Sequence, residues 1–255
     1  MGVTSIGRRL LPALLAGILG PALAGPIAID IGHSLAHPGA TSARGVPEFE
    51  FNQSLAAVLA ARLATDGVPT VLINPRGQVE DLPSRPQQAA GARLLVSIHH
   101  DAVQPGYLSH WIWQGRERAY SDRFAGFSLF VSRRNPHPAE SLACASRIGA
   151  ALRAEGLSPT GHHGEAIPGE NREAADAPNG VYYFDDLVVL KAATMPALLV
   201  EAGVIVHRDE ERALASPARR ELTVRAIVRG LGECGALPPS TAVPQTPVGT
   251  TTGSP

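Results

Sequence analysis

The chain has 255 residues and, with 22 basic and 23 acidic residues, a formal net charge of −1 at pH 7. Positive and negative charges are nearly equal in number and form no basic stripe along the chain. The charge pattern therefore does not indicate a nucleic-acid partner. The length is ample for one domain with a full hydrophobic core, and the sequence contains no internal repeat and no sign of a second domain.

Residues 1–24 have the pattern of a signal peptide. Arg8 and Arg9 precede an apolar run over residues 10–23, and Ala22-Leu23-Ala24 matches a small-residue cleavage site. A glycine and a proline interrupt the run, which is too short for a comfortable membrane span. We expect cleavage after Ala24, no membrane span in the mature chain, and a periplasmic or secreted location; an uncleaved anchor is the alternative.

Short apolar runs alternate with segments of helical spacing in the first half of the mature chain. After the first apolar run comes a loop rich in glycine, serine and proline, over residues 32–47. The patterns predict strands over residues 27–31, 71–73 and 93–98, and helices over residues 48–67 and 82–90.

The second half contains two segments without clear periodicity. Residues 104–123 carry Trp111 and Trp113 in polar surroundings and are expected to form a surface insertion. Residues 160–179 form a long polar loop, which inside a compact domain is usually functional or mobile. The other patterns predict strands over residues 126–131 and 197–200, helices over 138–154 and 210–234, a short strand or turn over 187–190, and a disordered Pro/Thr/Ser-rich tail over 238–255.

Alternating strands and helices predict an α/β fold, in which one domain over residues 25–237 contains a mostly parallel mixed sheet with helices on both faces. In such sheets the functional crevice lies outside the carboxyl ends of the strands. His33, His99 and Glu201 each follow a buried apolar run. We therefore expect these three side chains to converge at one edge of the sheet.

Two histidines at a sheet edge predict a metal site if a third ligand is near. Glu48 at the start of a helix is a candidate, although an acidic residue there also compensates the helix dipole, and spacing alone does not choose between Glu48 and Glu50. Catalytic zinc sites use three such ligands and keep one position open, which fits His33, Glu48 and His99. Glu201 is then available as the general base.

Each of these residues also has an ordinary structural interpretation. His33 alone would be a turn histidine, and Glu201 alone would be a strand-end partner in a surface ion pair. His100 follows His99 directly, so strand alternation directs it away from the crevice, where it would support or pack against other residues.

Cys144 and Cys234 are the two cysteines of the chain, and each lies on a predicted helix. An exported protein can pair them, but the distance between them does not follow from the sequence. The sequence is therefore consistent with a disulfide between these cysteines and also with two buried thiols.

Four motifs in order resemble the zinc-dependent N-acetylmuramoyl-L-alanine amidases that cleave peptidoglycan. That family has G-H-G-G-x-D-P-G-A after a strand, then a G-x-x-E segment that opens a helix, then S-I-H-A-N and P-A-V-L-V-E-x-G-F. The resemblance covers residues from about 26 to 231. The corresponding segments are Gly32-His33-Ser34-Leu35-Ala36-His37-Pro38-Gly39-Ala40, Gly45-Val46-Pro47-Glu48, Ser97-Ile98-His99-His100-Asp101 and Pro196-Ala197-Leu198-Leu199-Val200-Glu201-Ala202-Gly203.

The resemblance implies that His33, Glu48 and His99 bind Zn²⁺, which favours Glu48 over Glu50, and that Glu201 is catalytic. It implies peptidoglycan or muropeptides as substrate, cut at the amide between N-acetylmuramic acid and L-alanine. Some members need a protein activator to displace an inhibitory helix, so an activator is a candidate partner. Neither residues 104–123 nor residues 160–179 have the pattern of such a helix.

The sequence departs from the family pattern at several loop positions. Ser34-Leu35 stands in place of Gly-Gly, His37 in place of Asp, and His100-Asp101 in place of Ala-Asn; residues 204–207 also differ. Two alternatives to an amidase are a catalytically silent peptidoglycan-binding protein and a zinc peptidase that cuts within the stem peptide. A serine hydrolase is disfavoured, because no G-x-S-x-G motif is present.

Overall fold

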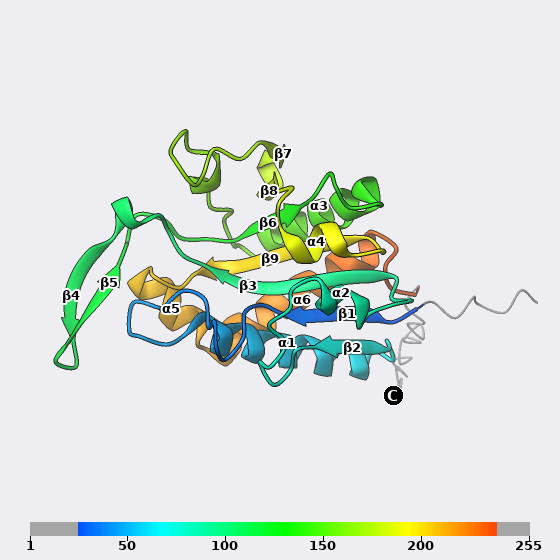
Figure 1. Ribbon diagram of the computed structural model, residues 1–255, viewed down its shortest axis with the longest axis horizontal. Coiled ribbons are helices and arrows are strands. Elements are labelled where there is room, and N and C mark those ends of the chain that lie inside the picture. The colour runs from blue at the N-terminus through cyan, green and yellow to red at the C-terminus, as the bar shows by residue number, and fades with distance from the viewer. Residues whose placement is uncertain (1–24, 239–255) are drawn as a thin grey trace, which may run out of the picture.

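The computed structural model describes residues 25–238, so the predicted signal peptide and nearly all of the predicted disordered tail lie outside the described residues. The described strands form a seven-stranded sheet and a separate two-stranded hairpin (Figure 1). The large sheet has the order β2-β1-β3-β9-β6-β8-β7. Its strands are β1 (Ile27–Ile31), β2 (Thr70–Ile73), β3 (Leu94–Asp101), β6 (Ser128–Val131), β7 (Ala174–Asp176), β8 (Val181–Tyr183) and β9 (Ala197–Val204); the hairpin contains β4 (Ser109–Trp113) and β5 (Arg116–Tyr120).

The sheet is mixed, as the sequence predicted. β2, β1, β3 and β9 pair in parallel, whereas β6 runs antiparallel to β9 and parallel to β8. β7 pairs antiparallel with β8. Because β6 begins where β9 ends, the crevice edge of the sheet receives the carboxyl ends of β1, β3 and β9 and the amino end of β6.

Helices cover the two faces unequally. α1 (Glu48–Thr65), α3 (Pro138–Ala154) and α6 (Pro217–Glu233) pack over one face, where alternate apolar residues of the strands meet residues such as Leu55, Ile148 and Ile227. The other face is covered by short elements, chiefly α2 (Ser84–Gln87) and α4 (Val188–Ala192). The expected α/β architecture with helices on both faces is therefore confirmed. The face covered only by short helices has a thinner layer over it, which leaves space for a cavity.

The prediction of a single terminal helix over residues 210–234 was wrong. The segment is two helices, α5 (Arg208–Leu214) and α6, separated at Ser216-Pro217. Proline cannot continue a helix but suits a first helical position, and the Ser216 hydroxyl accepts a hydrogen bond from the Arg219 N–H at 3.2 Å. The chain therefore turns and starts a new helix.

Other boundaries also differ from the sequence prediction. Of residues 187–190, expected as a strand or turn, residues 188–190 belong to α4 and Leu187 caps it, and the expected helix over 82–90 shortens to α2. The polar loop over 160–179 contains the 3-10 helices η2 (His162–Gly164) and η3 (Ala177–Asn179) and the edge strand β7, while β8 was not predicted. Strands of three residues are too short to leave a periodic signal. The insertion over 104–123 begins with η1 (Pro105–Tyr107) and continues as the β4–β5 hairpin.

Cys144 on α3 and Cys234, just after α6, form a disulfide. The alternative of two free buried thiols is therefore wrong. None of the helices within residues 25–238 combines the length and apolar character needed to cross a membrane.

Candidate active site

The backbone around His33 brings its ring close to that of His99. His33 follows β1 in a left-handed conformation, with φ at 66°, which is uncommon outside glycine. Its carbonyl oxygen accepts hydrogen bonds from Asn74 Nδ2, at 2.6 Å, and from the buried guanidinium of Arg85. At Gly32 a Cβ atom would lie 2.3 Å from the His99 ring, so only glycine lets the two segments approach this closely.

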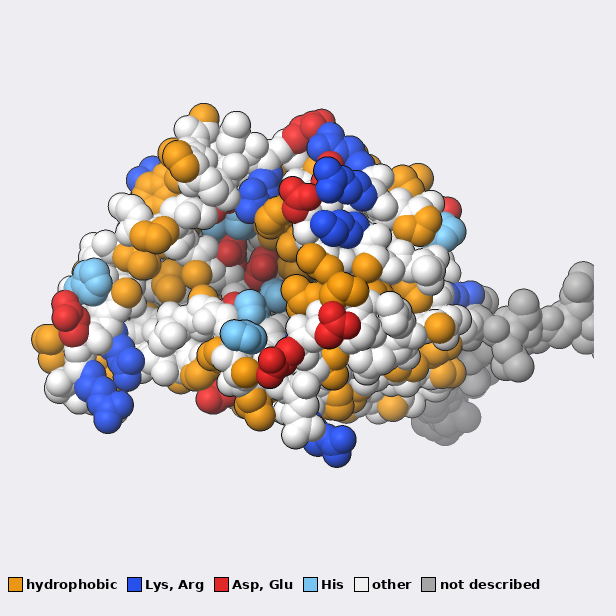
Figure 2. All heavy atoms as spheres, viewed as in Figure 1, with side chains coloured by type: hydrophobic (Ala, Val, Ile, Leu, Met, Phe, Trp, Pro, Cys, Tyr) orange, Lys and Arg blue, Asp and Glu red, His pale blue; other side chains and the backbone are white. Residues whose placement is uncertain are grey.

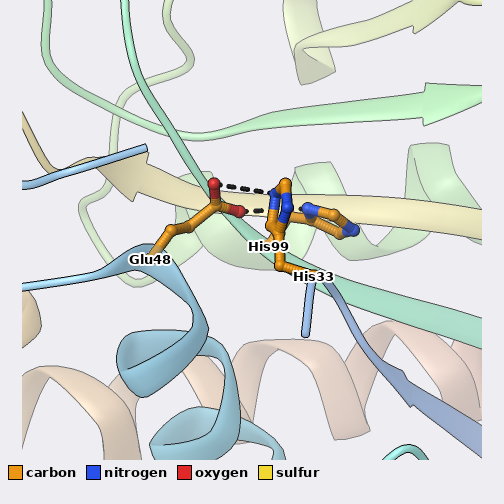
Figure 3. Close-up of side chains that lie close together, drawn as sticks. All are labelled: His33, Glu48 and His99. Atoms are coloured by element: carbon orange, nitrogen blue, oxygen red, sulfur yellow. Dashed lines mark hydrogen bonds and ion pairs between the residues drawn. The ribbon is translucent and has the colours of Figure 1, made fainter. Parts of the chain in front are cut away.

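The Glu48 carboxylate points toward both histidines, with one oxygen directed at each ring (Figure 3). Its Oε2 is 2.9 Å from His33 Nε2, and its Oε1 is 3.0 Å from His99 Nδ1. The rings of His33 and His99 meet edge to face with centroids 4.9 Å apart. Ligand atoms of these three residues all lie within 4.8 Å of one another, as a shared metal ion requires.

The charge of Glu48 is well stabilised. Burial by itself would raise the pKa of this carboxyl, but hydrogen bonds with His33 and His99 outweigh burial and hold the pKa well below its usual range. Glu50, the competing carboxylate in the sequence, is exposed and lines a different surface pocket. The structure therefore brings Glu48, and not Glu50, to the two histidines.

His100 lies behind this group rather than in it, as strand alternation predicted. Its Nδ1 is 2.8 Å from the Asn52 side-chain oxygen, and Asn52 Nδ2 donates to Glu48 Oε1 at 3.2 Å. Burial lowers the pKa of His100 to about 3, so the ring is neutral. His100 and Asn52 thus form a buried support that orients the Glu48 carboxylate.

Glu201 lies beside His99 across the sheet. The two residues are register partners on β9 and β3, so their side chains project from the same face. Burial, followed by the charges of Asp101 and Glu48, raises the pKa of Glu201 well above its usual value. Its Oε2 is shielded from solvent and has no hydrogen-bond partner within residues 25–238. A carboxyl in this state is suited to take up and release a proton.

The predicted residues face a crevice of about 280 Å³ (Figure 2). Figure 2 shows histidine and acidic side chains gathered in this hollow, with apolar side chains along its rim. A second, mostly apolar cavity of about 360 Å³ adjoins it below α4 and shares His33 and His99. Its apolar walls include Leu82, Leu187, Val189 and Leu199.

A second group of titratable residues, which was not predicted, adjoins the same crevice: Asp101, His163 and Glu170 line it, and His162 is buried behind them. His163 Nε2 is 2.8 Å from Asp101 Oδ2, and His162 Nε2 is 3.3 Å from the same oxygen. Glu170 Oε2 is 3.0 Å from His163 Nδ1. Burial by itself would lower the pKa of His163, but its hydrogen bonds to Asp101 and Glu170 raise it to about 9. The two adjacent histidines were visible in the polar loop, but the sequence does not show onto which strand that loop folds.

Comparison with known proteins identifies the fold and the family. A family model described as N-acetylmuramoyl-L-alanine amidase (Amidase_3) matches residues 27–233. A search of curated proteins finds no match.

Several solved structures of similar fold are amidases. The N-acetylmuramyl-L-alanine amidase Ami1 of Mycobacterium smegmatis is 22% identical, with a TM-score of 0.65 over 84% of this chain and 99% of that chain. The catalytic domain of CwlV from Bacillus (Paenibacillus) polymyxa var. colistinus is 22% identical, with a TM-score of 0.61 over 82% and 97% of the two chains. The CwlD amidase of Clostridioides difficile, solved in complex with the GerS lipoprotein, is 18% identical, with a TM-score of 0.62 over 83% and 98%. At these identities the likeness concerns the fold.

Proposed function

The chain belongs to the N-acetylmuramoyl-L-alanine amidase family, and from this we propose that it is a zinc-dependent hydrolase of peptidoglycan. The bond cut is the amide between the lactyl group of N-acetylmuramic acid and the L-alanine of the stem peptide. The observation that carries this proposal is the convergence of His33, Glu48 and His99 on one point, with Glu201 next to His99 in the sheet register.

The donor set fits zinc. Two imidazole nitrogens and one carboxylate are a common catalytic combination, and zinc bound there would polarise the amide carbonyl and lower the pKa of a water molecule towards about 7. Asn52 and His100 hold the Glu48 carboxylate in position by the buried hydrogen bonds described above. Asn74 and Arg85 hold the backbone of His33.

Glu201 transfers the proton between the attacking water and the leaving amine. Its carboxylate accepts a proton from the attacking water as the C–O bond forms at the amide carbon. It then delivers that proton to the amide nitrogen as the C–N bond breaks. The products are the lactyl carboxylate of the muramic acid and a stem peptide with a free L-alanine amino group.

Digestion of purified sacculi tests the proposal. We expect clearing of a sacculus-containing gel, loss of clearing with a chelator and recovery on addition of Zn²⁺. Mass spectrometry of released fragments should show intact stem peptides that begin with L-alanine. New α-carboxyl ends within the stem would instead identify a peptidase, and the absence of clearing with any metal would leave a catalytically silent wall-binding protein.

We further propose that the protein acts outside the cytoplasm, in the periplasm or after secretion, because its substrate lies there and its first residues match a signal peptide. Fractionation of the producing cells tests the location. One of the similar structures contains a bound lipoprotein, so a protein activator remains a partner to seek. An increase in the sacculus turnover of purified enzyme on addition of envelope extract would reveal one.

A further inference from the structure

The second titratable group in the crevice has the composition and arrangement of a metal site. Ligand atoms of Asp101, His162 and His163 all lie within 4.8 Å of one another, as do those of His33, Glu48 and His99. In both groups two imidazole nitrogens face one carboxylate. The two groups share no residue.

The two ring nitrogens of His163 face different partners: Nδ1 faces Glu170, and Nε2 faces Asp101 and the Ser128 hydroxyl. Glu170 lies 3.0 Å from Nδ1 and, as a carboxylate, can only accept, so the Nδ1 proton points to it. Without a metal, Nε2 carries a second proton towards the Asp101 carboxylate at 2.8 Å, and a bound cation would take the place of that proton. Two acceptors at this distance repel each other unless a proton or a metal ion lies between them.

His162 supplies a second nitrogen in the same direction. Its side chain is fully buried, and Nε2 has no hydrogen-bond partner within residues 25–238 although it lies 3.3 Å from Asp101 Oδ2. Its Nδ1 is occupied by the Thr160 hydroxyl at 2.8 Å. A buried imidazole nitrogen without a partner is costly, and coordination would satisfy it.

The surroundings match those of metal-binding histidines. Such residues usually donate their other ring N–H to a carboxylate or another acceptor, which fixes the ring. Here Glu170 is placed to accept from His163 Nδ1, and the Thr160 hydroxyl oxygen to accept from His162 Nδ1. Phe124 packs on the His162 ring and Phe130 on the His163 ring, with centroids 5.1 Å and 4.8 Å apart. These aromatic walls restrict both rings.

The charge of the crevice also favours a second cation. Four carboxylates line it, those of Glu48, Asp101, Glu170 and Glu201, whereas Arg172 is the one arginine or lysine among the lining residues. One divalent ion between His33 and His99, together with Arg172, would balance three of these four negative charges. The fourth leaves room for further positive charge beside Asp101 and Glu170.

We propose that Asp101, His162 and His163 bind a second transition-metal cation of the zinc class. Two imidazoles and a carboxylate are donors typical of zinc. The second ion faces the same crevice as the first, with Glu201 between them. Glu201 pairs in register with His99 on one side and with Ser128 on the other, and the Ser128 hydroxyl lies 3.1 Å from His163 Nε2.

Zinc content of the whole purified protein tests the proposal without any measurement of activity. After Zn²⁺ loading and removal of excess metal, we expect two equivalents per chain in the wild type. His162→Gln and His33→Ala should each retain one equivalent, and the double variant should retain none. His110→Gln, which removes an exposed histidine on the hairpin, should retain two.

The variants that lose zinc show whether the second metal site or the metal site of the proposed function has failed. A wild type with one equivalent that His33→Ala abolishes and His162→Gln leaves intact would overturn the second site. One equivalent lost only in His162→Gln would instead support the second site and contradict the first.

Titration of the metal-free wild type with Co²⁺ gives a reading that does not depend on how the variants fold. Visible absorption should rise through two equivalents. A rise that ends at one equivalent, together with one zinc in the wild type, would count against a second ion.

Discussion

The crevice and the β4–β5 hairpin both gather charged and aromatic side chains, but they do so in opposite environments. In the crevice the charges are enclosed and several ring nitrogens and carboxylates meet at two points. At the hairpin, Arg44 from the loop before α1 and Arg208 from α5 lie over the half-buried rings of Trp113 and Tyr120, with distances to the ring centroids of 4.9 Å and 4.0 Å. The hairpin projects from the body of the molecule and contributes no residue to the crevice lining (Figure 1).

This difference in environment determines how strongly a substitution in each region should change stability and activity. Electrostatic interactions strengthen where water is excluded, and a buried group that loses its partner is strongly destabilised. Exposed ion pairs are screened and contribute little. Substitutions in the crevice should therefore have large and specific effects, and those on the hairpin should have small ones.

The largest effect is expected at Glu201. Glu201→Ala should keep the metal between His33 and His99 but lower turnover by about 10²–10⁴-fold, the usual contribution of a general acid–base group. His99→Ala should lose both that metal and the activity. Metal analysis and turnover on sacculi, measured for both variants, check this. Full activity in Glu201→Ala would show that another group carries the proton.

A smaller but still large effect is expected beneath the crevice, at Arg85. Its buried guanidinium lies 3.3 Å from Asp30 Oδ1 and donates to the carbonyl of His33. Arg85→Met should lower the free energy of unfolding by about 3–5 kcal/mol, because it leaves Asp30 buried without its cation. Denaturant titration measures this loss.

Two further variants sharpen the result at Arg85. Asp30→Ala combined with Arg85→Met should be less destabilised than Arg85→Met alone, since no charge is then stranded. Arg62→Met, which removes the exposed ion pair with Asp66, should change stability little. Equal losses in Arg85→Met and Arg62→Met would contradict the proposed contrast between buried and exposed charge.

The disulfide tests whether stability and activity can be separated. Cys144 and Cys234 lie near the amino ends of β3 and β9, next to Leu94 and Pro196, at the edge opposite the crevice. Cys144→Ala with Cys234→Ala should lower the free energy of unfolding by about 2–5 kcal/mol. Turnover per folded molecule should stay unchanged. A loss of turnover in fully folded protein would show that the crevice depends on this distant bond.

The smallest effect is expected at the base of the hairpin, at Asp122. A hydrogen bond from Arg208 lowers the pKa of Asp122 below its usual value. Because the folded-state pKa is the lower one, this pair stabilises the protein above the unfolded pKa of about 4, and the contribution is lost as the pH falls through the folded value. Asp122→Asn should thus melt slightly below the wild type at about pH 7, with the difference vanishing at about pH 2. A difference that grows in acid would contradict this assignment.

The parts of the fold that sequence reasoning found are those with long regular patterns. The runs that became β1, β3 and β9 and the helix that begins at Glu48 were all visible, and the positions of His99 and Glu201 at the carboxyl ends of strands predicted that they meet at one edge of the sheet. The choice of Glu48 over Glu50 came from the family resemblance. The sequence spacing could not distinguish Glu48 from Glu50, because both residues lie in the first turn of the same helix.

The parts that were missed depend on contacts between distant segments. His162 and His163 reach Asp101 because β6 runs antiparallel beside β9 and the loop that follows α3 returns along β6, where Thr160 N donates to the Phe127 carbonyl. The three-residue strands β7 and β8 have too few residues for a period to be detected. The break before Pro217 was foreseeable from proline chemistry, but the helical spacing on both sides concealed it.

The placement of the two ends of the described chain has a practical consequence. β1 begins at Ile27 and leads towards the crevice, and the segment after α6 returns to the same far side, where Arg93 Nη1 donates to the Ala236 carbonyl at 3.0 Å. Both ends of the described segment therefore lie at the edge of the sheet opposite the crevice (Figure 1). An enzyme immobilised on a bead through either end would present its crevice outward, in the orientation needed to meet an insoluble mesh.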